Sequence, residues 1–336
     1  MGARAASERS AGPSAVACTR RPATGRRAFG AEPDGPLALG PCALVPHGVV
    51  ERAFEGRRVG LEVGGPDVER VRPGMVEATI ADLLWLGVDW DGAPVLQSTL
   101  AEGHARALQR LIAADLVYPC VCTRRELAEA SSAPNRGAAS EAYPGTCRGR
   151  FSSREEALER TGRDAALRFR TPPGRVQFED RLHGVQSIDV ASEVGDFPVT
   201  RRDGALAYQL AVVVDDAAQA VTDVVRGDDL LTSTARQVLL QRALAVPSPS
   251  WLHVPLVEDH TGRRLAKRDD DLSLATLRAS GVSPASIATW AARTAGLTAA
   301  GPESSAEPAA AWLERYQERT LTRSPTRLNP PPAPPL

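Results

Sequence analysis

Apolar positions along the chain recur at two spacings, one typical of amphipathic helices and one typical of strands. Stripes with the helical period cover residues 76–87, 100–112, 231–239 and 287–294. Segments rich in β-branched, aromatic and alternating apolar residues cover 166–171, 174–180 and 251–257. This alternation of helices and strands predicts an α/β fold.

A turn signal separates two further segments that look like strands. Residues 197–201 precede Asp203 and Gly204, and a long apolar run covers 205–216. The Asp-Gly pair suits the positive φ of a tight hairpin turn. The pattern therefore predicts a β-hairpin whose second strand lies within 205–216.

The chain is long enough for one large domain with an insert, or for two domains. It has 336 residues, more than a single hydrophobic core usually accommodates. Short mixed strands over 118–200 interrupt a larger helix-rich unit, which is the layout of a doubly wound, mainly parallel nucleotide-binding sheet with a substrate arm. The predicted parts are a disordered leader (1–25), the first half of a Rossmann-like domain (26–117), an inserted subdomain (118–200), the second half of that domain (201–297), and a helical remnant with a Pro-rich tail (298–336).

Composition and charge exclude some classes of protein. The net charge is −1, so the chain has no overall positive charge that would indicate nucleic-acid binding. Hydrophobic residues make up 43% of the sequence, which is typical of a globular domain. No apolar run reaches the ~18 residues of a membrane span, and the N-terminal residues lack the apolar segment of a secretory signal. Their Arg-rich, acid-poor composition also fits a transit peptide. The main expectation is a cytoplasmic protein without a membrane span.

Three of the five cysteines, Cys120, Cys122 and Cys147, lie in one short segment. They offer three thiolates to one ion, and zinc takes four ligands in a tetrahedron. Candidates for the fourth ligand are His104, His183 and the phenolate of Tyr143. His104 also lies on an apolar helical stripe, which favours a core histidine. The other interpretation of the cysteines is that they are small buried apolar groups.

The order Cys-x-Cys, Tyr143, Cys147 resembles the zinc site of bacterial glutamyl-queuosine tRNA(Asp) synthetases, truncated relatives of glutamyl-tRNA synthetase. Three longer segments resemble consecutive blocks of that family: AYQLAVVVDD at 207–216, VTDVVRGDDLL at 221–231 and HVPLVEDHTGRRLAKRD at 253–269. The resemblance covers residues 28–297 and is strongest after residue 118.

The resemblance implies a class I synthetase Rossmann fold with an inserted zinc-bearing α+β subdomain and without an anticodon-binding domain. It implies a ligase that activates glutamate with ATP and Mg²⁺ and transfers it to the queuosine base in the anticodon loop of tRNA(Asp), acting as a monomer. The zinc would be structural. Its implied ligands are Cys120, Cys122, Tyr143 and Cys147.

Two ATP-binding signatures of class I synthetases have counterparts in the sequence. RLAKR at 264–268 resembles the KMSKS loop, which assigns Lys267 a catalytic role at the phosphates, with Arg264 beside it. Gly35 and Gly40 belong to a segment that resembles the family's turn at a helix N-terminus, where backbone N–H groups and the helix dipole attract phosphate. The other interpretation of 264–268 is a solvated basic turn.

The glutamate site of the family is matched in part. Tyr208 and Arg226 match two of its four contacts, although without the resemblance they also fit a strand tyrosine and a surface arginine. Ala28 and Gly64 replace an arginine and a glutamate, and Ala38 replaces the histidine of the first ATP signature. These departures predict slow activation of glutamate with weak affinity. The alternatives are an impaired paralogue that binds nucleotides or RNA, and an adenylating enzyme for another carboxylate.

Overall fold

The computed structural model describes the residues that form the centre of the sequence and several shorter stretches around it. The described residues are 16–20, 57–60, 62–63, 75–87, 92–123, 125–127, 142–258, 274–294 and 326–327. Among the helices within them, none combines the length and the apolar character that crossing a membrane requires.

Strands and helices alternate along the described chain, as the sequence predicts. The strands are β1 Val16–Arg20, β2 Arg57–Gly60, β3 Glu62–Val63, β4 Val95–Leu96, β5 Val117–Cys120, β6 Ala166–Phe169, β7 Val176–Asp180, β8 Gly184–Ile188, β9 Val221–Gly227, β10 Ser250–Val254, β11 Val257–Glu258 and β12 Thr326–Arg327. The α-helices are α2 Met75–Trp85, α3 Ala101–Ala113, α5 Arg154–Thr161, α6 Val190–Glu193, α7 Tyr208–Ala218, α8 Leu231–Leu244, α9 Leu274–Ala279 and α10 Pro284–Thr294. Two 3-10 turns, η2 Gln97–Leu100 and η3 Asp228–Leu230, precede α3 and α8.

The largest sheet formed by the described residues has six strands in the order β2-β1-β9-β10-β7-β8. β10 runs parallel to β9 and β7, whereas β1 and β8 run antiparallel to their neighbours. The expected α/β class is confirmed, but the sheet is mixed rather than parallel. A short turn over 181–183 joins β7 to β8, which begins at Gly184 with φ +71°. A connection of this length allows only antiparallel pairing, because parallel neighbours need a long crossover.

Within the predicted leader over residues 1–25, the structure describes one strand, β1. Val16–Arg20 lies between β2 and β9 and pairs with both. Its β-branched and apolar residues suit extended backbone, and pairing on both edges stabilises a strand too short to be evident in the sequence. In the predicted tail over 298–336, Thr326–Arg327 likewise pairs with β11.

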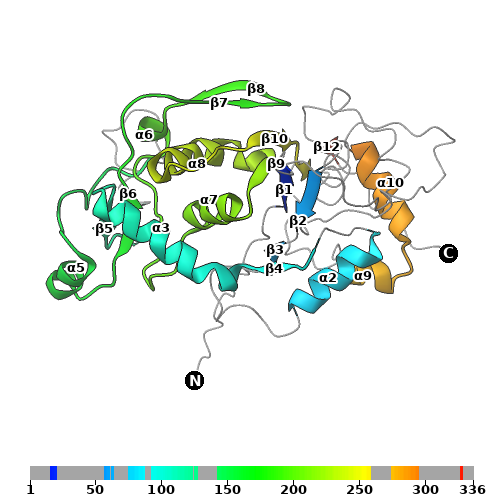
Figure 1. The fold of residues 1–336 in the computed structure, drawn as a ribbon, viewed down its shortest axis with the longest axis horizontal. Helices are drawn as coiled ribbons and strands as arrows, with labels where there is room; N and C mark the ends of the chain where they lie inside the picture. The colour runs from blue at the N-terminus through cyan, green and yellow to red at the C-terminus, as the bar shows by residue number, and fades with distance from the viewer. Residues whose placement is uncertain are drawn as a thin grey trace, which may run out of the picture.

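The predicted hairpin forms its turn but not its second strand. Arg201 N–H donates to Ala205 O at 2.7 Å, and Thr200 forms an isolated bridge with Leu206. The chain then becomes helical at Tyr208. α7 packs against α3, α8 and β9 (Figure 1). A helix surrounded in this way is apolar on most sides, so its sequence shows no helical period.

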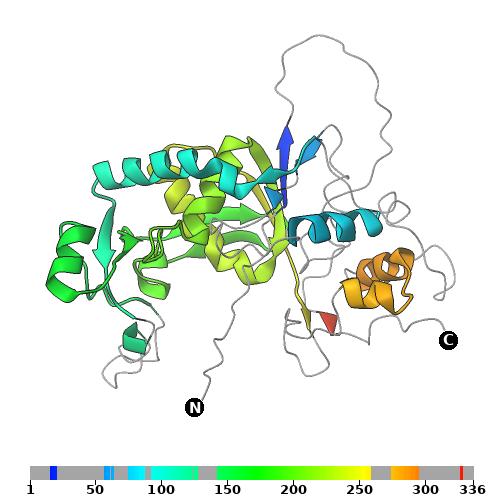
Figure 2. The same cartoon turned by 90° about the horizontal axis from the view of Figure 1, so that it is seen from below.

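One hydrophobic core joins the predicted insert to the rest of the molecule. Its buried residues come from α3, β5, β6, β7, β8, α6, α7, α8 and the segment between α6 and α7. β7 and β8 belong to the main sheet although they lie within 118–200. A second cluster surrounds Tyr118, Cys147 and Phe151. It lies with β5, β6 and α5 at one end of the long axis, opposite α2, α9 and α10 (Figures 1 and 2).

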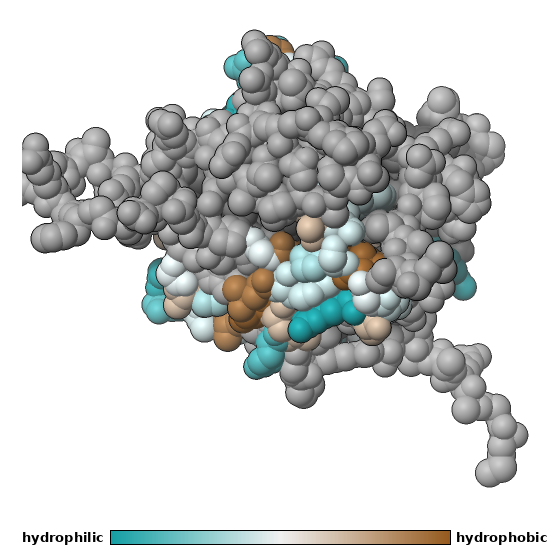
Figure 3. Space-filling model, turned by 90° about the vertical axis from the view of Figure 1, so that its right-hand side faces the viewer, coloured by the Kyte–Doolittle hydropathy of each residue, from teal (hydrophilic) through white to brown (hydrophobic). Residues whose placement is uncertain are grey.

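The end that carries α2 and α10 shows no continuous apolar surface on its described residues. Figure 3 views this end and shows hydrophobic and hydrophilic side chains intermixed. Leu84 of α2 is one of the exposed apolar residues there.

Candidate functional site

Three thiols and one phenol meet where β5 ends. Cys120 is the last residue of β5, Cys122 follows it, and Cys147 lies in a later turn. The three Sγ atoms lie within 4.8 Å of one another. Tyr143 Oη lies 3.4 Å from Cys120 Sγ and 3.8 Å from Cys122 Sγ, and the Cys122 and Cys147 Sγ atoms are 3.5 Å apart. The structure thus brings together all four groups that the resemblance implies.

These separations fit a tetrahedral zinc ion. With Zn–S distances of about 2.3 Å, tetrahedral ligands lie roughly 3.8 Å apart. All three cysteines are free of disulfides, and among the described residues the cluster contains no histidine. His104 instead lies with its Nε2 2.6 Å from Asp215 Oδ1, as expected of a core histidine. The set of four protein ligands leaves no open position, which is typical of a structural zinc site.

The thiols differ in how readily they ionise. Burial, together with the neighbouring Cys120 and Cys147, raises the pKa of Cys122 to about 12. Burial also opposes ionisation of Cys120, but contacts with Tyr143 and Arg168 outweigh it and lower the pKa of that thiol. The protein thus favours ionisation of Cys120 and opposes ionisation of Cys122.

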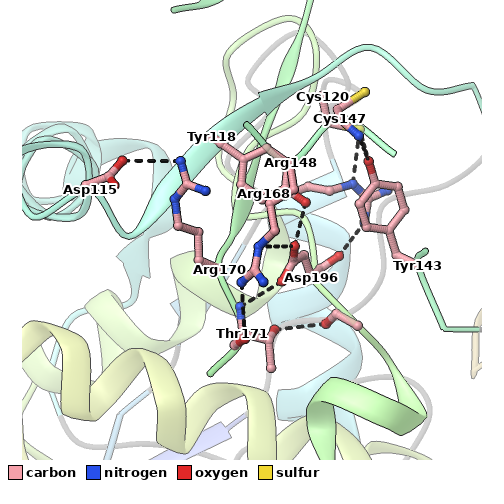
Figure 4. Close-up of polar contacts among 11 residues, drawn as sticks. Asp115, Tyr118, Cys120, Tyr143, Cys147, Arg148, Arg168, Arg170, Thr171 and Asp196 are labelled. Carbon is pink, nitrogen blue, oxygen red and sulfur yellow. Dashed lines mark hydrogen bonds and ion pairs between the residues drawn. The ribbon is translucent and has the colours of Figure 1, made fainter. Parts of the chain in front are cut away.

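Arg168 of β6 contacts this cluster from the protein interior (Figure 4). Its Nε donates to Cys120 Sγ at 3.2 Å, and its guanidinium carbon lies 3.8 Å from the centroid of the Tyr143 ring. Its Nη1 donates to the backbone carbonyl of Asp196 at 2.6 Å. Arg168 thus places positive charge beside two of the four candidate ligands.

Asp196 is a buried acceptor that ties the neighbouring elements together (Figure 4). Its carboxylate accepts hydrogen bonds from Tyr118 Oη at 2.6 Å and from Thr171 N–H at 2.8 Å, and it forms an ion pair with Arg148 at 3.2 Å. The carboxylate is almost fully buried. The two residues before Asp196, Val194 and Gly195, contact the backbone of Tyr143.

A second group of functional side chains lies at β9 and the start of α7. Arg226 of β9 is 3% exposed and Tyr208, the first residue of α7, is 38% exposed. Burial raises the pKa of Tyr208, and the Arg226 guanidinium opposes this effect. Burial lowers the pKa of Arg226, and Tyr208 and Asp216 oppose it. The two side chains are therefore neighbours, and Arg226 is a buried residue rather than a surface arginine.

Two further polar side chains contact Arg226 and a third lies behind one of them, and sequence analysis missed all three. Arg226 Nε donates to His253 Nε2 at 3.0 Å, and its Nη2 donates to Thr234 Oγ1 at 2.7 Å. His253 Nδ1 lies 2.7 Å from Asp180 Oδ2. Asp180 and His253 are fully buried. The available signal was a histidine inside the apolar strand WLHVPLV and an aspartate ending the strand at 174–180.

The predicted ATP-binding residues lie outside the described residues, as do three positions that depart from the family. The ATP-binding residues are Gly35, Gly40, Arg264 and Lys267, and the departures are Ala28, Ala38 and Gly64. Their roles stay predictions from the sequence.

Comparison with known proteins agrees with this arrangement. The family described as class I tRNA synthetases (E and Q), catalytic domain, matches residues 50–307. A glutamyl-Q tRNA(Asp) synthetase from Nitratidesulfovibrio vulgaris is 44% identical over 250 residues, which cover 72% of this chain and 77% of the relative. One from Geobacter sulfurreducens is 44% identical over 260 residues, which cover 76% and 79%. The chain belongs to the glutamyl-Q tRNA(Asp) synthetase family. It is a ligase of the class I aminoacyl-tRNA synthetase type.

The solved structures confirm the fold expected of a glutamyl-Q tRNA(Asp) synthetase. A crystal structure of a glutamate tRNA ligase from Elizabethkingia meningosepticum, in complex with its amino acid, matches with a TM-score of 0.63 at 24% identity. The match covers 80% of this chain and 60% of the ligase, so the chain spans less than two thirds of that protein. The fold is that of a class I catalytic domain.

Proposed function

We propose that this protein activates glutamate with ATP and Mg²⁺ and transfers it to the queuosine base in the anticodon loop of tRNA(Asp). The observation that carries the proposal is 44% identity over 250 residues to a glutamyl-Q tRNA(Asp) synthetase. The pairing of Tyr208 with the buried Arg226 supports it, because a guanidinium is suited to hold a carboxylate. In this proposal the protein acts as a cytoplasmic monomer.

The proposed ATP site combines one side chain with backbone donors. Lys267 contacts the phosphates, Arg264 lies beside it, and N–H groups of the turn from Gly35 to Gly40 complete the site. Lys267 is the only lysine in the sequence, and all the other strongly basic side chains are arginines. A lysine in this one place supports a specific role, since a compact ammonium and a guanidinium are not interchangeable at a phosphate.

Zinc completes the proposal as a structural ion. Cys120, Cys122, Tyr143 and Cys147 would hold it, and it would fix the insert over 118–200 between the two halves of the catalytic domain at 26–117 and 201–297. Zinc supplies cross-linking here rather than Lewis-acid chemistry, because all four ligand positions are filled by protein groups.

Pyrophosphate exchange with each amino acid tests the proposal. We expect exchange that depends on glutamate and is slow, because Ala28, Ala38 and Gly64 remove charged or donor groups that the family uses. The double substitution Ala38→His with Gly64→Glu should accelerate it. Exchange with a different carboxylate in place of glutamate would indicate another adenylating enzyme, and no exchange with any amino acid would indicate a binding protein.

A further inference from the structure

Two of the three guanidinium nitrogens of Arg226 have hydrogen-bond partners, and the guanidinium lies against an aromatic ring. Its Nε and Nη2 donate to His253 and Thr234, and its guanidinium carbon lies 4.8 Å from the centroid of the Trp251 ring. Its Nη1 is buried and has no hydrogen-bond partner among the residues that the structure describes. A buried donor of this kind is costly unless a ligand satisfies it.

The register of the sheet sets His253 beside Arg226. The two residues are direct partners in the parallel pair β9–β10, and Trp251 is the partner of Asp180 in the pair β10–β7. A single carboxylate oxygen, Asp180 Oδ2, lies 2.9 Å from the His253 backbone nitrogen and 2.7 Å from Nδ1. The other oxygen accepts the N–H groups of Leu182 and His183. Asp180 is thus fixed in place by four contacts.

These contacts determine which nitrogen of His253 carries the proton. A carboxylate only accepts hydrogen bonds, so Nδ1 must be the donor, and in a neutral ring Nε2 is then the acceptor. Burial lowers the pKa of His253, although Asp180 opposes the effect, so the neutral ring is favoured. An Nε2 lone pair is what the Arg226 Nε–H requires.

We propose that Asp180 and His253 are positioning residues that hold Arg226 in one orientation, with Nη1 presented to the carboxylate of the amino-acid substrate. The inference rests on the proposed function, in which Arg226 binds glutamate. Asp180 fixes the tautomer of His253, and His253 fixes the guanidinium. Holding the donor in place before the substrate arrives lowers the ordering cost of binding.

A second buried His–Asp contact provides a matched control. His104 Nε2 lies 2.6 Å from Asp215 Oδ1, and His104 is 6% exposed, but this pair joins α3 to α7 and includes no arginine. His104→Phe and His253→Phe therefore remove the same kind of contact. Only the second removes a partner of Arg226.

The test is pyrophosphate exchange by the full chain as a function of glutamate and ATP concentration. His253→Phe should raise the KM for glutamate about tenfold or more, as expected for loss of a hydrogen bond to a charged group, with a smaller change in kcat and no change in the KM for ATP. His104→Phe should leave the KM for glutamate unchanged. Equal effects of the two substitutions on that KM would overturn the proposal.

A spectroscopic measurement separates this inference from the proposed function. ¹⁵N-histidine labelling reports the tautomers of all five histidines, and His253 should show a protonated Nδ1 and an unprotonated Nε2 in the wild type. Asp180→Asn should change that tautomer. If the wild type shows no exchange with glutamate, or if His253→Phe does not fold, the expected tautomer still supports the arrangement. A protonated Nε2 in the wild type would overturn it.

Discussion

At the scale of single residues, Arg168 would balance charge at the proposed zinc site. Three thiolates and a phenolate around one divalent ion would carry more negative than positive charge. Arg168 donates to Cys120 Sγ at 3.2 Å and lies over the Tyr143 ring, and it is itself almost fully buried. Partners that hydrogen-bond to metal ligands commonly contribute 10–100-fold to metal affinity.

Arg168→Gln should therefore weaken zinc binding by roughly 10–100-fold. Competition with a chromogenic chelator measures this affinity directly. Arg170→Gln is the control, because Arg170 comes from the same part of the chain but contacts Asp115 and the Tyr118 ring. Equal zinc affinity in wild type and Arg168→Gln would show that Arg168 only packs against the cluster.

Lys267 is the residue whose role in ATP binding is most easily isolated. Lys267→Ala should weaken ATP binding or abolish adenylation by removing the ammonium at the phosphates, whereas Arg263→Ala should have a much smaller effect. Titration calorimetry with ATP and pyrophosphate exchange measure the two quantities. Unchanged ATP affinity in both variants would identify 264–268 as an ordinary basic turn.

At the scale of elements, Gly195 shows how the backbone holds a candidate zinc ligand. Gly195 has φ +74°, and a Cβ there would lie 2.5 Å from Tyr143 O and 2.9 Å from Tyr143 N. Tyr143 N–H donates to Val194 O at 2.9 Å, and Thr171 Oγ1 donates to Gly195 O at 2.9 Å. The two segments can approach this closely only because residue 195 has no side chain.

Gly195→Ala should lower the free energy of unfolding by about 1–3 kcal/mol more than Gly184→Ala, because overpacking adds to the strain of a positive φ. Gly184 has φ +71°, and a Cβ at that position would meet no atom within 4 Å, so Gly184→Ala measures the strain alone. Urea unfolding of both variants gives the comparison. Equal losses would mean that the backbone of Tyr143 moves aside without cost.

The spacing of apolar residues predicts a helix or strand well when one of its faces is exposed, and poorly when neighbouring elements bury it on all sides. The stripe at 100–112 corresponds to α3, whose buried residues are His104, Ala107 and Leu111 on one face. The pattern at α7 instead predicts a strand, because the run from Leu210 to Val213 is buried throughout. The pattern gives no sign of β1, because pairing with distant strands, rather than its own sequence, stabilises it.

The thiol cluster could be predicted from the sequence, whereas the residues around Arg226 could not. Spacing and resemblance together identify the thiol cluster and Tyr143, whose ligand atoms come from one segment of the chain. Asp180 and His253 are 73 residues apart, and only the pairing of β7 with β10 brings them together. A long-range register of this kind has no local signature in the sequence.

At the scale of the whole molecule, the thiol cluster lies at one end of the long axis and is packed separately from the main core (Figure 1). Arg226 lies in the central strand β9. The structure therefore separates the candidate metal site from the candidate amino-acid site. Loss of zinc should disturb the first without unfolding the second.

Zinc removal should accordingly reduce transfer of glutamate to tRNA more than pyrophosphate exchange. Exhaustive chelation followed by both assays measures the difference, and readdition of zinc is the control. Equal loss of the two activities would mean that the ion supports the whole catalytic domain. A protein that never contained stoichiometric zinc by elemental analysis would rule out the proposed structural ion.

The most direct test of the proposed function is the transfer of labelled glutamate to tRNA(Asp) in the presence of ATP. The acceptors are tRNA(Asp) that carries queuosine and the same tRNA with an unmodified guanine at that position. We expect ATP-dependent labelling of the queuosine-containing tRNA alone, slow in the wild type and further reduced by Arg226→Ala at low glutamate concentration. Absence of label from the queuosine-containing tRNA, or equal labelling of both tRNAs, would show that the proposed function is wrong.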